Sequence, residues 1–231
     1  MDSREALVAN KIEFKTSGSG PHAILTHGWK NDHSIWEPLI EELQGDFTCL
    51  VWDLPAHGGS PSIEPGADPH SEVLNQLDYL VDYCSHASGH PPILIGHSLG
   101  GYFSLSYAIR NPLRVAGLGL LATGPGYKRE EPREIWNRWV LDNADPSRPG
   151  QAELCLQRDS HVVDGLTSIG RDVVVVAGER DVGFAASADL LSAKIAGSHK
   201  TEISGAGHML HKTHAAECAA ALRNLVPDDG D

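Results

Sequence analysis

Short apolar runs alternate with longer amphipathic stretches along most of this 231-residue chain. An apolar run of about four to eight residues suits a strand that is buried on both faces, and a longer stretch with helical spacing suits a helix that covers a sheet. Because parallel strands need long crossover connections, the alternation predicts an α/β fold with a mostly parallel, twisted sheet and flanking helices. The expected strands are residues 23–26, 48–52, 92–95, 115–121, 172–177 and 200–204.

Amphipathic patterns predict a helix after most of these runs. In each, the apolar side chains recur at a spacing that places them on one helical stripe. The stretch that follows Ser98 should end near Asn111-Pro112, because the residue before a proline is disfavoured in a helix. Two short N-terminal pieces, Leu7-Val8 and Ile12-Glu13-Phe14, predict an antiparallel edge. The other expected helices are residues 35–43, 73–81, 185–195 and 211–225.

Residues 124–171 interrupt the alternation and are rich in charge, proline and glycine. A structureless loop of that length is unusual inside a compact domain, so we predict a small helical cap. The core domain would then consist of residues 1–123 and 172–231. Trp136 and Trp139 lie on one apolar stripe of the cap, and two interpretations of this stripe stay open: packing onto the core, or lining a ligand pocket.

Charge and composition limit the partners and the location of the chain. It has 18 Lys and Arg against 31 Asp and Glu, a formal net charge of −13. Such a chain repels phosphate backbones and anionic lipids, so we expect no nucleic-acid partner and no membrane partner. The acidic N-terminus does not resemble a signal peptide, and we expect a cytoplasmic location. Four widely spaced cysteines favour buried free thiols over disulfides or metal ligands.

Residues 96–100 carry the strongest functional signal of the sequence. Gly96-His97-Ser98-Leu99-Gly100 follows an expected strand and precedes an expected helix. A nucleophile elbow holds a serine on a strained turn, and the positions two before and two after it must be small because the helix and strands press on the turn. Ser98 is therefore the candidate nucleophile. The amide of Leu99, the first of the helix, is a candidate to bind an oxyanion.

A serine nucleophile requires a general base and a carboxylate that orients the base. Asp181 lies on the loop after the strand at 172–177, and His208 ends the loop after the strand at 200–204. Taken singly, Asp181 could be a helix cap and His208 one of 13 histidines. Their arrival after successive strands, in the order Ser98, Asp181, His208, favours a catalytic triad.

With these motifs the chain resembles α/β-hydrolase fold enzymes of the small esterase, lactonase and haloperoxidase type, over almost its full length. Two further motifs carry the resemblance, Thr26-His27-Gly28-Trp29 and Asp53-Leu54-Pro55-Ala56-His57-Gly58-Gly59-Ser60. The resemblance implies that the backbone amide of Trp29 completes the oxyanion hole and that His27 supports this loop. Ala56 departs from the family pattern, which usually has a glycine at that position.

We therefore expect a serine hydrolase that cleaves a small to medium neutral or apolar ester, lactone or thioester through an acyl-enzyme on Ser98. Trp136 and Trp139 are the candidate residues of the substrate pocket, and no metal or organic cofactor is expected. Three alternatives stay open on the same fold: a cofactor-independent dioxygenase, a carbon–carbon bond hydrolase, or a ligand receptor. The intact triad argues against the receptor, which would typically have lost a triad residue.

Basic residues of the predicted cap raise the question of a carrier protein as a partner. Acidic residues lie among them, which favours a solvated mixed face over a docking patch for an acidic carrier domain. The sequence does not name the substrate or the oligomeric state. The basic residues are Lys128, Arg129, Arg133 and Arg138, and the acidic ones are Glu130, Glu131 and Glu134.

Overall fold

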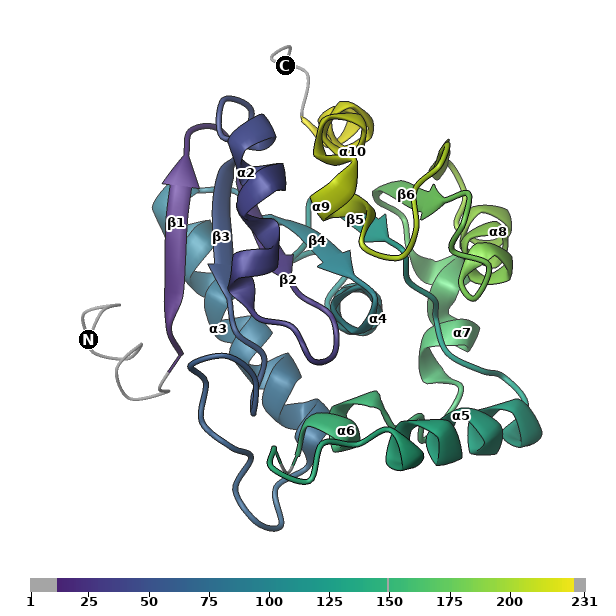
Figure 1. The fold of residues 1–231 in the computed structure, drawn as a ribbon. Helices are drawn as coiled ribbons and strands as arrows, with labels where there is room; N and C mark the ends of the chain where they lie inside the picture. The colour runs from purple at the N-terminus through teal and green to yellow at the C-terminus, as the bar shows by residue number, and fades with distance from the viewer. Residues whose placement is uncertain (1–11, 149, 227–231) are drawn as a thin grey trace.

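The computed structural model describes residues 12–148 and 150–226, which build a seven-stranded sheet (Figure 1). The spatial order is β1-β3-β2-β4-β5-β6-β7. β1 pairs antiparallel with β3 and every other pairing is parallel, which confirms the predicted mostly parallel α/β sheet. The strands are β1 (Phe14–Gly18), β2 (His22–Thr26), β3 (Thr48–Trp52), β4 (Ile93–His97), β5 (Gly117–Leu121), β6 (Asp172–Gly178) and β7 (His199–Ile203).

Both faces of the central strands are buried, which explains their continuous apolar sequences. Successive side chains of a strand point to opposite faces. In β2, Ile24 packs into the core on one face of the sheet, whereas Ala23 and Leu25 pack into the core on the other. A central strand of a doubly covered sheet therefore needs an apolar residue at nearly every position.

The edge strands differ from the prediction because they need little apolar surface. β1 is mostly exposed and has the polar sequence Phe-Lys-Thr-Ser-Gly. The expected edge at Ile12-Glu13-Phe14 is therefore corrected to Phe14–Gly18, and Leu7-Val8 lies outside the described residues. β7, at the opposite edge, is also largely polar and runs over His199–Ile203, one residue earlier than expected.

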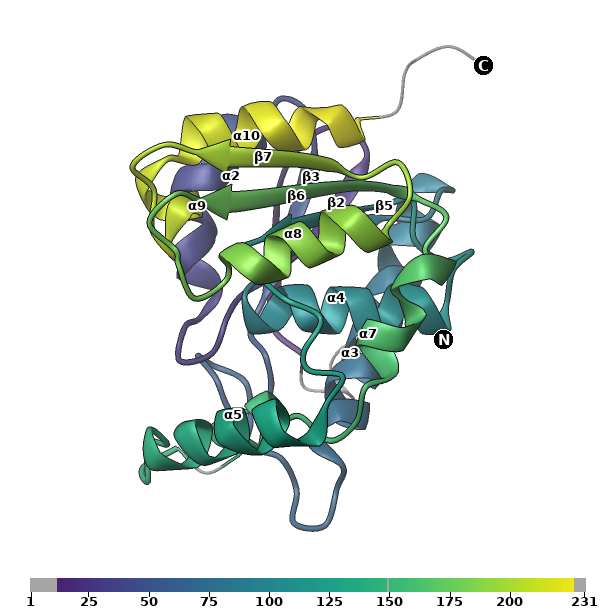
Figure 2. The ribbon, with the colours of Figure 1, turned by 90° about the vertical axis from the view of Figure 1, so that its right-hand side faces the viewer.

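Helices cover both faces of the sheet (Figure 2). α2, α9 and α10 pack on one face and α3, α4 and α8 on the other. The helix expected over residues 211–225 divides at His214, whose backbone is not helical (φ −138°, ψ 48°). The helices of these two layers are α2 (Glu37–Leu43, preceded by the 3₁₀ turn His33–Trp36), α3 (Pro69–Ser88), α4 (Leu99–Arg110), α8 (Ala185–Lys194), α9 (Leu210–Thr213) and α10 (Ala215–Leu222, followed by the 3₁₀ turn Arg223–Leu225).

The segment between β5 and β6 is helical. It contains α5 (Glu130–Asp142), α6 (Gln151–Cys155) and α7 (His161–Gly165), with a 3₁₀ turn at Leu166–Ser168. α5 and α6 lie beyond α4 on the α3 side of the sheet (Figure 1). The indole nitrogen of Trp136 donates a hydrogen bond to the carbonyl oxygen of Cys155 at 2.8 Å and so joins α5 to α6. The division into a core domain and a cap stays a prediction.

All four cysteines are free and buried, as the sequence predicts. Burial raises the pKa of the Cys49 thiol to about 12, so this thiol stays protonated at neutral pH. None of the helices in residues 12–148 and 150–226 combines the length and the apolar character that crossing a bilayer requires.

Gly100 marks the closest approach of α4 to the sheet and gives a first prediction. A Cβ there would lie 2.0 Å from the backbone oxygen of Thr26, and backbone atoms cannot move away as a flexible side chain can. We expect Gly100→Ala to lower the free energy of unfolding by about 3 kcal/mol or more, or to prevent soluble expression. Urea denaturation measures the change.

Gly45 provides the matched control for this substitution. A Cβ at Gly45 would meet no atom within 4 Å. Gly45→Ala should therefore change the free energy of unfolding by less than about 1 kcal/mol. Equal stability of Gly100→Ala and Gly45→Ala would contradict the tight packing of α4 on β2.

Candidate active site

Ser98 lies on the turn between β4 and α4. Its backbone adopts φ 52° and ψ −115°, a conformation that residues with side chains rarely take. Gly96 allows the turn to close, because a Cβ there would come within 2.4 Å of the Gly101 amide nitrogen. Strain of this kind costs about 1–3 kcal/mol and persists where the surrounding structure holds it, typically at functional sites. The local geometry of Ser98 is that of a nucleophile elbow.

Asp181 and His208 meet through a hydrogen bond. Nδ1 of His208 lies 2.8 Å from Oδ2 of Asp181. Because a carboxylate only accepts, Nδ1 carries the proton and Nε2 is left with a free lone pair. The Asp181 side chain is 10% exposed and that of His208 37% exposed, so the carboxylate is shielded while the imidazole is accessible. This is the arrangement of a general base with its orienting carboxylate.

The loops that carry this pair are joined to each other. The amide of Arg180 donates to the carbonyl oxygen of Ala206 at 2.8 Å. A Cβ on Gly178 would lie 2.5 Å from the same oxygen, so the two loops approach more closely than a side chain allows. The ring of Phe184 stacks on His208 with centroids 4.8 Å apart. The loop after β6 therefore supplies both the carboxylate and a packing surface for the imidazole.

His97 connects the serine turn to the loop of His208. Its Nε2 donates to the backbone oxygen of His208 at 2.9 Å, and the two rings lie 4.8 Å apart. Gly28 packs on the same side chain, because a Cβ there would lie 2.9 Å from Nδ1 of His97. The loops after β2, β4 and β7 thus meet around one buried histidine. Residues predicted from three separate motifs are brought to the same edge of the sheet.

His27 holds the loop that follows β2. Its Nδ1 donates to the carbonyl oxygen of Gly28 at 2.8 Å, and its Nε2 accepts from the Leu54 amide at 3.0 Å. A histidine that donates with one nitrogen and accepts with the other is neutral. Burial lowers the pKa of His27 to about 4, which agrees with this tautomer. His27 therefore ties the loop that carries Trp29 to the loop after β3.

Trp29 and Leu99 carry the two amides expected to bind an oxyanion. Leu99 is the first residue of α4, so its N–H has no partner within the helix and lies at the positive end of the helix dipole. The Trp29 loop lies over the elbow, since a Cβ on Gly28 would be 3.1 Å from Cβ of Ser98. Asn31 Nδ2 restrains this loop by donating to the Trp29 carbonyl at 2.9 Å. The role of both amides stays a prediction.

An open pocket lies beside Ser98. Trp136 and Phe184 contribute aromatic surface to its wall. Trp136 thus lies where the sequence predicts a pocket residue. The complete lining is Ser98, Leu99, Tyr102, Gly124, Gly126, Tyr127, Trp136, Cys155, Gln157, Phe184 and Ser187.

Trp139 does not line this pocket, which corrects the prediction that both tryptophans do. Its side chain is 48% exposed. Its ring lies 5.2 Å from that of Trp136 and 5.9 Å from that of Trp29, centroid to centroid. One turn of α5 separates Trp139 from Trp136, and this displacement carries it past the pocket toward the loop after β2. Trp136 therefore both lines the pocket and packs against the core, whereas Trp139 stays half exposed beside Trp29.

Residues 21–145 match the family model described as the alpha/beta hydrolase fold. The chain belongs to the alpha/beta hydrolase fold family. The matched range contains the loop of Trp29 and the elbow of Ser98. Asp181 and His208 lie beyond this range.

Known proteins similar to this alpha/beta hydrolase extend the comparison over nearly the whole chain. The pimeloyl-[acyl-carrier protein] methyl ester esterase of Stenotrophomonas maltophilia is 27% identical over 267 aligned positions, covering 95% of this chain and 99% of that protein. The protein of the same name from Xylella fastidiosa is 28% identical, covering 92% and 98%. A thermophilic esterase from Thermogutta terrifontis superposes with a TM-score of 0.79 at 21% identity, covering 94% of each chain, which is a likeness of fold.

The polar lining of the pocket in this alpha/beta hydrolase was not predicted from the sequence. Tyr102 lies four residues after Ser98, so helical spacing places both on one side of α4. The same spacing also suits packing against the core, where Tyr102 is 7% exposed, so it does not by itself identify a pocket residue. Gln157 lies on a loop without periodicity after α6, and no sequence signal identifies it.

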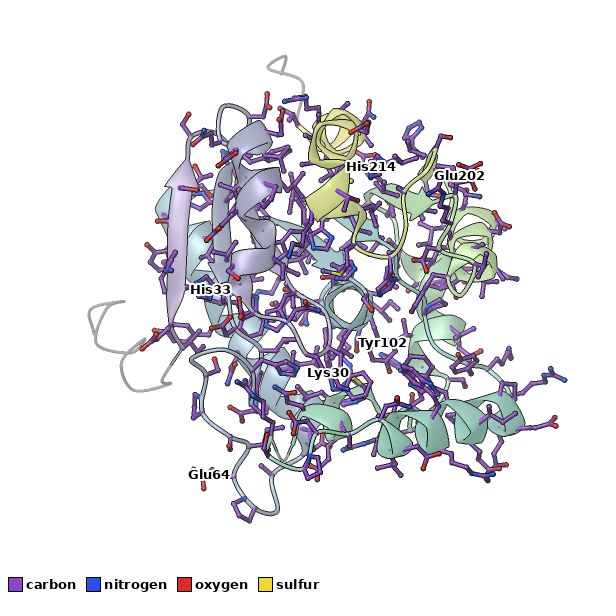
Figure 3. The ribbon with its side chains drawn as sticks, viewed as in Figure 1. Lys30, His33, Glu64, Tyr102, Glu202 and His214 are labelled. Carbon is purple, nitrogen blue, oxygen red and sulfur yellow. The ribbon has the colours of Figure 1, made fainter. Side chains whose placement is uncertain are left out.

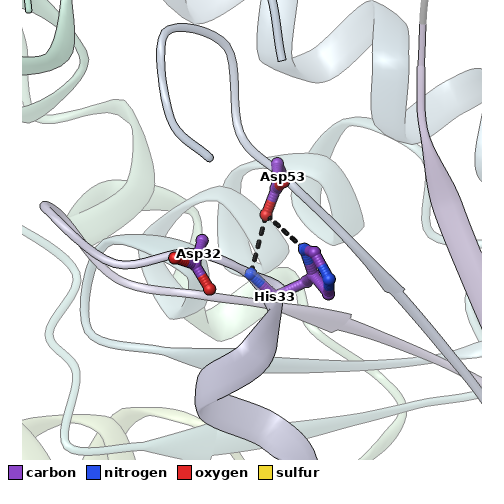
Figure 4. Close-up of side chains that lie close together, drawn as sticks. All are labelled: Asp32, His33 and Asp53. Carbon is purple, nitrogen blue, oxygen red and sulfur yellow. Dashed lines mark hydrogen bonds and ion pairs between the residues drawn. The ribbon is translucent and has the colours of Figure 1, made fainter. Parts of the chain in front are cut away.

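Asp32, His33 and Asp53 form a separate cluster of possible metal ligands in this alpha/beta hydrolase (Figure 4). Oδ1 of Asp53 accepts from the backbone amide of His33 at 2.7 Å and from Nδ1 of His33 at 3.0 Å. Oδ2 accepts from the Gly59 amide at 2.9 Å. Burial raises the pKa of Asp53, but these hydrogen bonds outweigh it and lower the pKa below its ordinary value. These hydrogen bonds use both carboxylate oxygens of Asp53 and join the loop after β2 to the loop after β3. The absence of a metal stays a prediction.

Asp181, and not Glu179, is expected to be the acid of the triad. The Glu179 carboxylate accepts from the Gly205 amide at 2.6 Å and from the Ser204 hydroxyl at 2.9 Å. Asp181→Asn should lower kcat on a short acyl ester by roughly 10³-fold or more, because an amide favours the wrong tautomer of His208. Glu179→Gln should change kcat by less than about threefold. Steady-state kinetics decide, and a greater loss in Glu179→Gln would reverse the assignment.

Buried histidines beneath the site predict that the fold is labile to acid. The rings of His97 and His211 lie 4.3 Å apart, and His211 also contacts Trp36 at 4.8 Å. Burial lowers the pKa of His211 to about 3 and that of His97 well below 6.5. Between these values and 6.5 the unfolded chain binds protons that the folded chain does not. Stability should therefore fall as pH drops below about 6.5, by about 1.4 kcal/mol per pH unit for each such histidine.

His211→Phe tests this prediction because it keeps a ring and removes a titrating group. Both ring nitrogens of His211 are buried without a partner, so the substitution breaks no hydrogen bond. Urea denaturation at pH 7, 6 and 5 should give a smaller decrease in stability for this variant, by about one proton's contribution. His199→Phe, at an exposed position, is the control and should leave the decrease unchanged. An unchanged decrease in His211→Phe would mean that the folded protein also protonates this residue.

Proposed function

We propose that the chain is a serine esterase that works through an acyl-enzyme on Ser98. The observation that carries the proposal is the 2.8 Å hydrogen bond between His208 Nδ1 and Asp181 Oδ2, next to the strained serine turn. A serine hydroxyl is a weak nucleophile until a neutral imidazole, held by a carboxylate, takes its proton. The chain is an alpha/beta hydrolase acting on ester bonds, in line with the methyl ester esterases among its relatives.

In the proposed mechanism, Nε2 of His208 accepts the proton of Ser98 while Oγ attacks the ester carbonyl. The amides of Trp29 and Leu99 bind the oxyanion of the tetrahedral intermediate. The intermediate expels the alcohol, which receives its proton from His208. Water then attacks the acyl-enzyme with His208 again as the base, and the acid leaves. Asp181 holds the imidazole tautomer and stabilises the imidazolium in both steps.

The pocket supports a small to medium, uncharged acyl group. Trp136 and Phe184 offer apolar contact to such a group in the pocket beside Ser98. No lysine or arginine lines this pocket, so a charged group would lose its hydration without gaining a counter-charge. The relatives are named for methyl esters, and we propose that methanol or another small alcohol is the leaving group here. A lactone or thioester offers the same carbonyl and is the second choice.

The charges of α5 favour a free ester over a substrate bound to a carrier protein. The relatives are named for an ester on an acyl-carrier protein. In this chain Arg133 and Arg138 alternate with acidic residues of the same helix, and Lys128 pairs with Asp164 at 2.9 Å. Mixed charge gives a weak field toward an acidic partner. We therefore propose that the ester is recognised through the pocket and without a carrier.

Ser98→Ala tests the acyl-enzyme directly. Loss of the nucleophile should lower kcat on methyl butyrate by about 10⁴-fold or more and leave the urea midpoint nearly unchanged. A fluorophosphonate probe should label the unmodified protein on the peptide that contains Ser98, as mass spectrometry detects, and should not label Ser98→Ala.

Ser104 supplies the control for this experiment. It lies on the same helix, where its hydroxyl donates to the Gly100 carbonyl at 2.9 Å. Ser104→Ala should therefore still be labelled by the probe. Activity of Ser98→Ala within tenfold of the parent would contradict the acyl-enzyme. Oxygen uptake without ester hydrolysis would instead favour a dioxygenase.

A further inference from the structure

Gln157 and Tyr102 share one wall of the pocket beside Ser98. A Cβ added to Gly126 would lie 2.1 Å from Oε1 of Gln157 and 3.4 Å from Cε2 of Tyr102, which places the amide beside the ring. Tyr102 follows Ser98 by one turn of α4, and its amide donates to the Ser98 carbonyl at 3.2 Å. It lies on the side of α4 that faces α5 and α6 (Figure 3). The proposed mechanism uses neither side chain.

Gln157 is held firmly in place by α5. Its backbone amide donates to Oδ1 of Asn137 at 2.7 Å, and Nδ2 of Asn137 donates to its carbonyl oxygen at 2.9 Å. This reciprocal pair fixes the loop after α6 against α5. The side-chain amide of Gln157 is therefore carried to the pocket wall by a rigid support, as a group that selects substrate must be.

The amide of Gln157 lacks a partner. The residue is only 7% exposed, and Oε1 is buried without a hydrogen bond. Within residues 12–148 and 150–226, no hydrogen bond joins Nε2 of Gln157 or the Tyr102 hydroxyl to another protein group, and of these three atoms only Oε1 is fully buried. Buried polar groups are nearly always paired, and an apolar side chain of similar size would fill the space without an unmet hydrogen bond. An unpaired amide and a hydroxyl on one pocket wall are features of a binding subsite.

We propose that Gln157 and Tyr102 form a polar subsite for a hydroxyl group on the acyl chain of the substrate. A hydroxyl both donates and accepts, so it can bind the amide and the tyrosine together. A half-turn of the Gln157 amide exchanges the positions of its oxygen and nitrogen, so the amide can either accept a hydrogen bond from the substrate hydroxyl or donate one to it. A carboxylate is disfavoured because no cation lines the pocket. This inference rests on the proposed ester hydrolysis. The substrates would then be esters of hydroxy acids.

Two methyl esters of equal size test the subsite. Methyl 6-hydroxyhexanoate and methyl heptanoate differ only by a hydroxyl in place of a methyl group. Acid release in a pH-stat gives kcat/KM for each ester with the unmodified protein, Gln157→Leu and Tyr102→Phe. The ratio of kcat/KM for the hydroxy ester to that for the heptanoate should fall about tenfold in Gln157→Leu and by a smaller factor in Tyr102→Phe.

Gln76 is the matched control. It lies on α3, is also 7% exposed and has a buried Oε1 without a partner, but it does not line the pocket. Gln76→Leu should leave the ratio unchanged. A fall of the same size in Gln76→Leu would show that the effect is not specific to the pocket and would overturn the assignment.

The remaining outcomes separate this inference from the proposed function. An unchanged ratio in Gln157→Leu, with both esters hydrolysed, overturns the subsite and leaves ester hydrolysis standing. Hydrolysis that survives Ser98→Ala counts against the proposed function instead. If Gln157→Leu yields no soluble protein, Tyr102→Phe decides by the same ratio, because it removes one oxygen atom from the wall and an unchanged ratio there also overturns the subsite.

Discussion

The close contact between the start of α4 and the parallel sheet is the constraint on which the rest of the site depends. A Cβ at Gly100 would lie 2.0 Å from the Thr26 oxygen, so the helix lies nearer to β2 than any side chain permits. Ser98, directly before this helix, has a positive φ of 52°, and α4 begins where β4 ends, at the carboxyl edge of the sheet. Because β2, β4, β6 and β7 are parallel, the loops that follow them arrive at that same edge. The loops that carry Ser98, Asp181 and His208 can therefore be short and still come together.

The central sheet and the candidate triad could be predicted from the sequence because both follow from chain order and burial. Strands buried on both faces must be apolar throughout, and loops that follow parallel strands must converge. The edge strands could not be predicted in this way. β1 needs only the hydrogen bonds of β3 and exposes most of its side chains, so its polar sequence carries no strand signal. The break at His214 interrupts an otherwise regular helical pattern, and the sequence has no proline or glycine there that would signal it.

The pocket could be predicted only in part, because a stripe of residues does not say which neighbour will cover each member. Trp136 and Trp139 share the stripe, yet one reaches the pocket and the other reaches Trp29. Ala56 gives a second example. It adopts φ 61°, a left-handed value that favours glycine, and hydrogen bonds of its amide to the Pro61 carbonyl and of its carbonyl to Gln151 Nε2 hold it there. Tertiary contacts outweigh the local preference at this turn.

Neutral histidines around the site explain how His97 can support His208 without competing with it. Burial keeps the pKa values of His27 and His97 well below 6.5, so at neutral pH both rings are uncharged. The uncharged His97 therefore donates a hydrogen bond to the backbone oxygen of His208. It adds no positive charge beside the imidazolium that the proposed mechanism forms on His208. A cation in place of His97 would repel that imidazolium and would compete with His208 for the negative charge of Asp181. The burial that is expected to make the fold labile to acid is thus the same burial that keeps His97 uncharged beside His208 and Asp181.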